Sequence, residues 1–184
     1  MTPAEYLQLK AFARQDGALL ALLWVGSFAS YVAGLSSPSY SMFSILLMVL
    51  TPFFAYHRLQ NFRDKGRDGI ISFLRGWAFV VFMFFYAGLL LAIVQYAYFA
   101  YFDNGYMLES LIRMLSTPEA AQMVEQSGMK ETMNESVHEL QSMRPIDLTL
   151  NVLTTNILIG MLVGLPIAAV AKRSTGSNGQ PGQQ

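Results

Sequence analysis

The sequence predicts an all-α fold, an integral membrane bundle of four transmembrane helices with a short helical extracytoplasmic cap. The main observation is four long stretches that contain no Asp, Glu, Lys, Arg or His: residues 17–35, 40–56, 76–102 and 148–171. A bilayer core needs roughly 20 apolar residues in a helix, and a helix satisfies its own backbone hydrogen bonds where lipid cannot. The charged fraction of 13% is also well below the value of about 25% for soluble domains.

The distribution of charge predicts the orientation of these spans. Residues 1–16, 57–75 and 172–184 together hold nine basic and four acidic side chains, a net charge of +9 − 4 = +5. Residues 103–147 hold three basic and eight acidic side chains, a net charge of +3 − 8 = −5. The positive-inside rule then predicts that both termini and the second connection are cytoplasmic, and that the acidic third connection is outside.

The first element is expected to start at a capping box, Thr2-Pro3-Ala4-Glu5, and to run into the span at residues 17–35. Its first turns are expected at the membrane interface. Cleavage of this span as a signal peptide is the alternative, which the acidic residues at positions 5 and 16 and the charge pattern disfavour.

The next two elements have clear boundary signals. A tight turn at residues 34–38 makes the first two spans a hairpin, and Pro52 predicts a kink in the second. The third span is the longest. Trp77 at one end and the tyrosines near its other end form an aromatic belt at the two interfaces.

The acidic connection, residues 103–147, predicts short amphipathic helices. Leu108, Leu111, Ile112 and Leu115 recur at helical spacing, and a second stripe comprises Met129, Met133, Val137 and Leu140. Breaks are expected near residues 116–118 and 127–128. Residues 1–173 are expected to form a single four-helix transmembrane domain, and residues 174–184 a disordered cytoplasmic tail.

Small residues recur every four positions in the first and last spans. They are Gly26, Ser30 and Gly34 in the first and Gly160, Gly164 and Ala168 in the last. Such residues let helix backbones approach closely. They therefore predict either packing inside the monomer or the seam of a homo-oligomer.

Polar side chains inside the spans are uncharged. The candidates for intramembrane contacts are Gln95, Asn151, Thr155 and Asn156. They either hold helices together through hydrogen bonds of ~0.6 kcal/mol on average or line a path for a solute. Because the spans lack ionisable groups, a proton relay or ion-coupled transport is disfavoured.

The basic residues of the second connection are candidates for contact with lipid headgroups. They are Arg58, Arg63, Lys65, Arg67 and Arg75. The simpler interpretation is that these charges only set the orientation of the protein.

The sequence offers no recognisable catalytic, cofactor or metal site. It has no cysteine, and no nucleophile–base pair is apparent. Glu135 and His138 have Glu-x-x-His spacing, but a di-iron bundle needs two such motifs and further carboxylates. We therefore expect neither an enzyme nor a cofactor, and no nucleic acid among the partners.

Three short motifs resemble one known family. They are Gly69-Ile70-Ile71-Ser72-Phe73, Ser127-Gly128-Met129 and Ala171-Lys172-Arg173. The arrangement of the spans also fits, with a hairpin of two spans followed by two single spans after longer connections. The chain resembles the bacterial "domain of unknown function 4199" membrane proteins over about residues 8–173. The resemblance implies the four-helix fold and the bacterial inner membrane, with no activity or catalytic residues to transfer.

Two functions follow as expectations from the closely packing helices, the uncharged spans and the acidic cap. The first is a non-enzymatic scaffold or partner-binding protein, whose partners are the lipid bilayer and a membrane protein or a second copy of the chain. The alternative is a small oligomeric transporter or channel.

Overall fold

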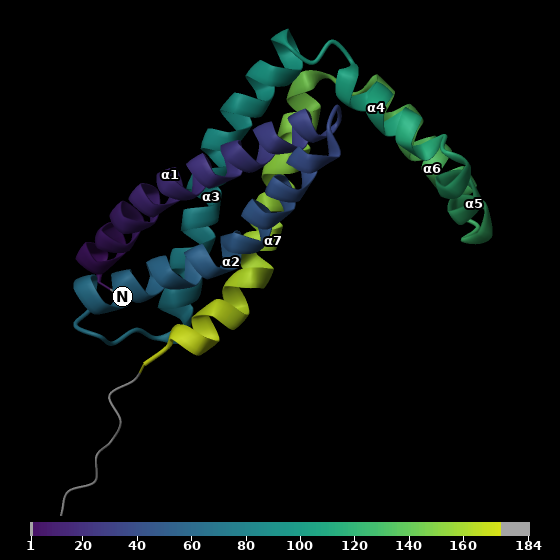
Figure 1. Cartoon of the computed structure of the whole chain (residues 1–184). Coiled ribbons are helices and arrows are strands. Elements are labelled where there is room, and N and C mark those ends of the chain that lie inside the picture. The colour runs from purple at the N-terminus through teal and green to yellow at the C-terminus, as the bar shows by residue number, and fades with distance from the viewer. Residues whose placement is uncertain (1, 174–184) are drawn as a thin grey trace, which may run out of the picture.

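The computed structural model describes residues 2–173, which form seven α-helices (Figure 1). Four are long: α1 (Pro3–Gly34), α2 (Pro38–Gly66), α3 (Phe73–Tyr101) and α7 (Pro145–Ala171). Three are short: α4 (Tyr106–Leu115), α5 (Pro118–Gln126) and α6 (Lys130–Ser142). All four long helices are long and apolar enough to cross a membrane. The predicted fold class, an all-α membrane bundle with a helical cap, is confirmed.

Two of the long helices, α1 and α2, extend well beyond the predicted apolar stretches at one end of the bundle. α1 begins at Pro3, where Thr2 and Glu5 form the predicted capping box: the Thr2 N–H donates to Glu5 Oε2 over 2.8 Å, and the Thr2 hydroxyl accepts from the Glu5 N–H. α2 continues past its apolar stretch to Gly66. This end carries the N-terminus, the α2–α3 connection and Arg173, and is called the basic end below; the opposite end is the cap end.

The hydrophobic core lies in the half of the bundle nearer the basic end. Its fully buried members come from all four long helices, and include Leu9, Ala13, Leu20, Leu59, Phe62, Phe79 and Ala171. Phe62 and Phe79 stack with their ring centroids 4.7 Å apart. Leu9 and Ala13, in the first turns of α1, are buried in this core. That these turns lie at the membrane interface stays a prediction.

The helices pack as two pairs. α1 packs along α2, and α3 packs along α7. The contact between α1 and α3 joins the pairs and is as extensive as that between α1 and α2, whereas α2 has few contacts with α3 and α7. Towards the cap end, this arrangement leaves α2 packed mainly on α1.

A regular register joins α3 to α7. An added Cβ at Gly160 would lie 2.6 Å from Phe84 Cβ, one at Gly164 would lie 3.1 Å from Trp77, and one at Gly76 would lie 3.5 Å from Ala168 Cβ. Gly160 and Gly164, four residues apart, thus face larger residues of α3, whereas Gly76 and Ala168 face each other. The two antiparallel backbones approach closely along this line, as small-residue stripes allow in membranes.

The cap extends away from the bundle as α4, α5 and α6 (Figure 1). The predicted breaks are confirmed, because Thr117 caps α5 and Gly128 has a positive φ of 68° between α5 and α6. α6 begins one residue later than its predicted stripe, since Met129 is its N-cap. None of the three cap helices contains a buried residue.

Candidate functional site

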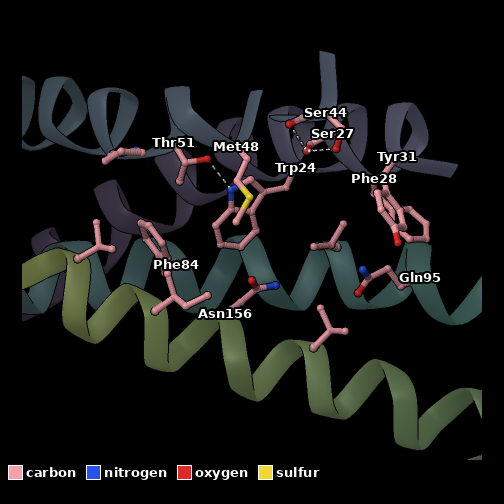
Figure 2. Close-up of a pocket in the computed structure, with 15 residues that line it drawn as sticks. Trp24, Ser27, Phe28, Tyr31, Ser44, Met48, Thr51, Phe84, Gln95 and Asn156 are labelled. Atoms are coloured by element: carbon pink, nitrogen blue, oxygen red, sulfur yellow. Dashed lines mark hydrogen bonds between the residues drawn. The ribbon is translucent and has the colours of Figure 1, made fainter. Parts of the chain in front are cut away.

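A cavity of about 380 Å³ lies between the two helix pairs, in the half of the bundle nearer the cap end. α1 and α2 form one wall, and α3 and α7 form the other (Figure 2). The lining is mostly apolar, with Phe28, Met48 and Leu91 among its members, and contains no charged side chain. Its size and character match those of typical small-molecule sites.

Two hydrogen bonds hold polar side chains on the α1–α2 wall. Trp24 Nε1 donates to Thr51 Oγ1 over 3.1 Å, and the Ser27 hydroxyl donates to the Ser44 carbonyl over 3.1 Å (Figure 2). Thr51 in turn donates to the Leu47 carbonyl one turn earlier in α2. These groups are therefore satisfied by the protein itself.

The opposite wall carries two amides, Gln95 on α3 and Asn156 on α7 (Figure 2). Gln95 is only 6% exposed, and its Oε1 has no hydrogen-bond partner among the described residues. Most buried polar atoms in proteins are hydrogen-bonded. An unpaired amide oxygen on a cavity wall therefore marks a place where a ligand group can bind.

The cavity is closed towards the basic end. Trp24 meets Phe84 edge-on, with ring centroids 5.2 Å apart, and the buried core lies beyond this contact. Towards the cap end, a second cavity of about 280 Å³ begins, and the two share Tyr31 and Val152 as lining residues. Asn151 lines the second cavity, beneath α4 and α6.

The predicted small-residue stripes meet other parts of the same chain. Gly160, Gly164 and Ala168 face α3, as described above. In the first span, a Cβ added to Gly34 would clash with Ser41 of α2, whereas one added to Gly26 would be 3.7 Å from Leu47. Ser30 is half-buried in α1. Thr155, unlike its neighbour Asn156, is exposed on the outer face of α7.

Four of the five candidate headgroup residues contact protein groups at the basic end. Arg67 Nη1 and Arg75 Nη2 both donate to the Glu5 carboxylate, over 2.8 and 3.1 Å. Arg63 is buried and donates to the carbonyl of Ala171 at the end of α7, over 3.1 Å, and to Asp64. Arg58 pairs with an acidic residue of α1, and Lys65 is exposed. Contact with lipid headgroups stays a prediction.

The partner of Arg58 is Asp16, a pair that the sequence analysis missed. Arg58 Nε donates to Asp16 Oδ1 over 2.8 Å, and a second guanidinium nitrogen contacts the same oxygen. Asp16 is 1% exposed and directly precedes Gly17, whose backbone lies against α3. The only sequence signal was an acidic residue at the very edge of an apolar stretch, which is weak because span edges are often charged.

The cap has a shallow groove of about 240 Å³ between its three helices, lined by residues that include Ile112, Val124 and Val137. Met114, Met123 and Met129 lie on the cap with more than half of their surface exposed. Within residues 2–173, no group of three or more His, Asp or Glu side chains is placed to hold a metal ion.

Comparison with known protein families identifies the family of this chain. The model of one family, "Protein of unknown function (DUF4199)", matches residues 15–173, which is most of the sequence. The chain belongs to this family. No curated protein and no solved structure matches it.

Membership of the DUF4199 family confirms the resemblance found in the sequence motifs. The matched region begins just before Asp16 and ends at Arg173, so it includes both the buried ion pair and the bridge between Ile71 and Arg173. The family assigns no activity, and any function must be argued from the cavity, the cap and the basic end.

Proposed function

We propose that this DUF4199 protein is a non-enzymatic scaffold or partner-binding protein of the bacterial inner membrane, with both termini in the cytoplasm. The orientation is supported by the net charge of +5 on the basic-end segments and −5 on residues 103–147. The cap would then lie outside the cytoplasm, where it is accessible to a protein partner.

The observation that carries this proposal is the exposed apolar surface of the cap. Met123 is 72% exposed, and Met114 and Met129 are also mostly exposed, although the cap lies outside the long apolar helices. Exposed apolar residues on an aqueous surface are typical of interaction sites, and methionine adapts well to the shape of a partner.

The charge of the cap favours a basic partner. With three basic and eight acidic residues in positions 103–147, a second cap or an anionic lipid surface would meet charge of its own sign. Like charges facing each other oppose association, while a basic protein surface is attracted over the Debye length of about 8 Å at physiological salt. We therefore expect the cap to bind a different protein, rather than a second copy of this chain.

Site-specific photocrosslinking in native membranes tests this proposal. A photoreactive amino acid at Met123 should give a discrete band of higher mass, and the band should weaken severalfold when Glu131, Glu135 and Glu139 are changed to Gln. The matched control is the same amino acid at Leu22, a highly exposed residue of α1, which should give lipid adducts only. Lipid adducts alone at both positions would contradict the proposal.

A small oligomeric transporter or channel is the second candidate, and the central cavity with its two amides supports it. A path through one copy of the chain would, however, have to cross the fully buried core between the cavity and the basic end, including Leu20, Leu59 and Phe62. This packing favours the partner-binding proposal.

A further inference from the structure

The central cavity is suited to a ligand that enters from the bilayer. Met48 of α2 and Ile159 of α7 both line the cavity, yet they are 66% and 38% exposed. The cavity therefore opens sideways between α2 and α7, where these two helices have few contacts. In a membrane this opening faces lipid, and an apolar molecule can enter without crossing water.

The lining determines the charge of the ligand. None of the residues around the cavity is ionisable at neutral pH, and the hydroxyls of Ser27 and Thr51 are already hydrogen-bonded within the protein. A charged group brought into such surroundings would lose its hydration without gaining a partner. The cavity thus selects an uncharged molecule.

Gln95 determines which polar group the ligand carries. Its Oε1 is buried without a partner, and its amide can both accept and donate. A hydroxyl group matches both roles, because it donates to the amide oxygen and accepts from the amide N–H. Asn156 offers a second amide on the same wall (Figure 2).

The position of Gln95 gives the ligand a direction. Gln95 lies near the end of α3, which finishes at Tyr101, whereas Phe84 lies deeper. At 1.5 Å per residue, these two positions are about 16 Å apart along the helix. The polar end of a lipid at Gln95 would therefore be near the membrane surface, with its hydrocarbon chain extending towards the Trp24–Phe84 contact.

We propose that the central cavity binds an uncharged bilayer lipid with a free hydroxyl, of the diacylglycerol class, with the hydroxyl on Gln95 and one acyl chain extending between the two walls towards the Trp24–Phe84 contact. This site is independent of the cap and of its protein partner. The proposed lipid site lies in the half of the bundle nearer the cap end, outside the packed hydrophobic core.

Photolabelling of the full-length protein in nanodiscs tests the site. The probe is a diacylglycerol with a diazirine in one acyl chain, and the matched control probe is phosphatidylglycerol with the same chain. We expect the diacylglycerol probe to label the segments around Trp24–Tyr31 and Ser44–Pro52 severalfold more than the control probe does. Equal labelling by the two probes would mean ordinary lipid contact and would overturn the proposal.

Three variants separate the parts of the proposal. Gln95→Leu, which removes the amide, should reduce diacylglycerol labelling severalfold towards the level of the control probe. Ser27→Phe, which fills the cavity, should abolish labelling of these segments. Thr155→Val removes a polar group from the exposed face of α7 and should leave labelling unchanged. Full labelling of Gln95→Leu would overturn the role of the hydroxyl, whether or not Ser27→Phe folds.

Discussion

At the residue scale, ion pairs hold the basic end together. The Asp16–Arg58 pair joins α1 to α2, and Glu5 joins the start of α1 to Arg67, which follows α2, and to Arg75 in the first turn of α3. Arg63 satisfies a carbonyl at the end of α7, where the helix leaves such groups unpaired. The same cationic side chains that predict orientation thus also fix the positions of the helices.

We predict that Asp16→Asn destabilises the protein by about 3 kcal/mol or more, because it leaves Arg58 facing a buried site without its counterion. Thermal unfolding in detergent, followed by tryptophan fluorescence, measures the change. The matched control is Asp68→Asn, the same substitution at an exposed position, which should leave the midpoint nearly unchanged. Equal midpoints for the two variants would show that the pair contributes little.

At the scale of helices, α3 and α7 form the most extensive contact of the bundle, and Gly160 is the tightest point in it. A Cβ there would be 2.6 Å from Phe84 Cβ, whereas a Cβ on Gly26 of α1 would have ordinary contacts at 3.7 Å. Both glycines belong to the small-residue stripes of the sequence, but the structure makes different demands on them.

We therefore predict opposite effects for the same substitution at these two glycines. Gly160→Ala should destabilise the protein by about 1–3 kcal/mol through overpacking, and should perturb Trp24 fluorescence, since Phe84 contacts Trp24. Gly26→Ala should be neutral or stabilising by up to about 1 kcal/mol, because alanine is the better helix former. The measurement is the thermal unfolding midpoint of both variants. A Gly160→Ala variant as stable as Gly26→Ala would contradict the close approach of α7 to α3 at Gly160.

The sequence predicted the helices better than their packing. Long apolar stretches and capping signals such as Thr2 to Glu5 depend on neighbouring residues, so the spans, the first cap and the breaks at Thr117 and Gly128 were predictable. The residues of the hydrophobic core were not predictable, because an apolar side chain of a membrane helix can face either lipid or the protein interior. The cavity was not predictable for the same reason. Gln95 was identifiable as a polar residue, but whether its side-chain oxygen has a hydrogen-bond partner depends on how all four helices pack.

At the scale of the whole molecule, the bundle is asymmetric. In the half nearer the basic end, the hydrophobic core is closely packed and ion pairs connect the helices, while the half nearer the cap end contains the two cavities. Both proposals, a lipid in the central cavity and a protein partner on the cap, concern the half nearer the cap end. The asymmetry also predicts that solute does not cross the protein, because the cavity stops at the contact between Trp24 and Phe84.

Cysteine labelling tests this asymmetry, because the natural chain contains no cysteine to interfere. In intact cells, a membrane-impermeant thiol reagent should label Ser127→Cys in the cap, and should label Lys65→Cys at the basic end only after the inner membrane is permeabilised. Both residues are exposed, so accessibility within the protein is matched. Gln95→Cys should stay unlabelled in both conditions, since the side chain is buried and its cavity is lined mostly by apolar residues.

The possible outcomes separate orientation from permeation. Labelling of Lys65→Cys in intact cells, with Ser127→Cys protected, would reverse the orientation and place the cap in the cytoplasm. Rapid labelling of Gln95→Cys by a water-soluble reagent would instead indicate a wet cavity, and would favour the transporter or channel over the partner-binding protein. Because the buried core separates the cavity from the basic end, we expect the protected result at Gln95.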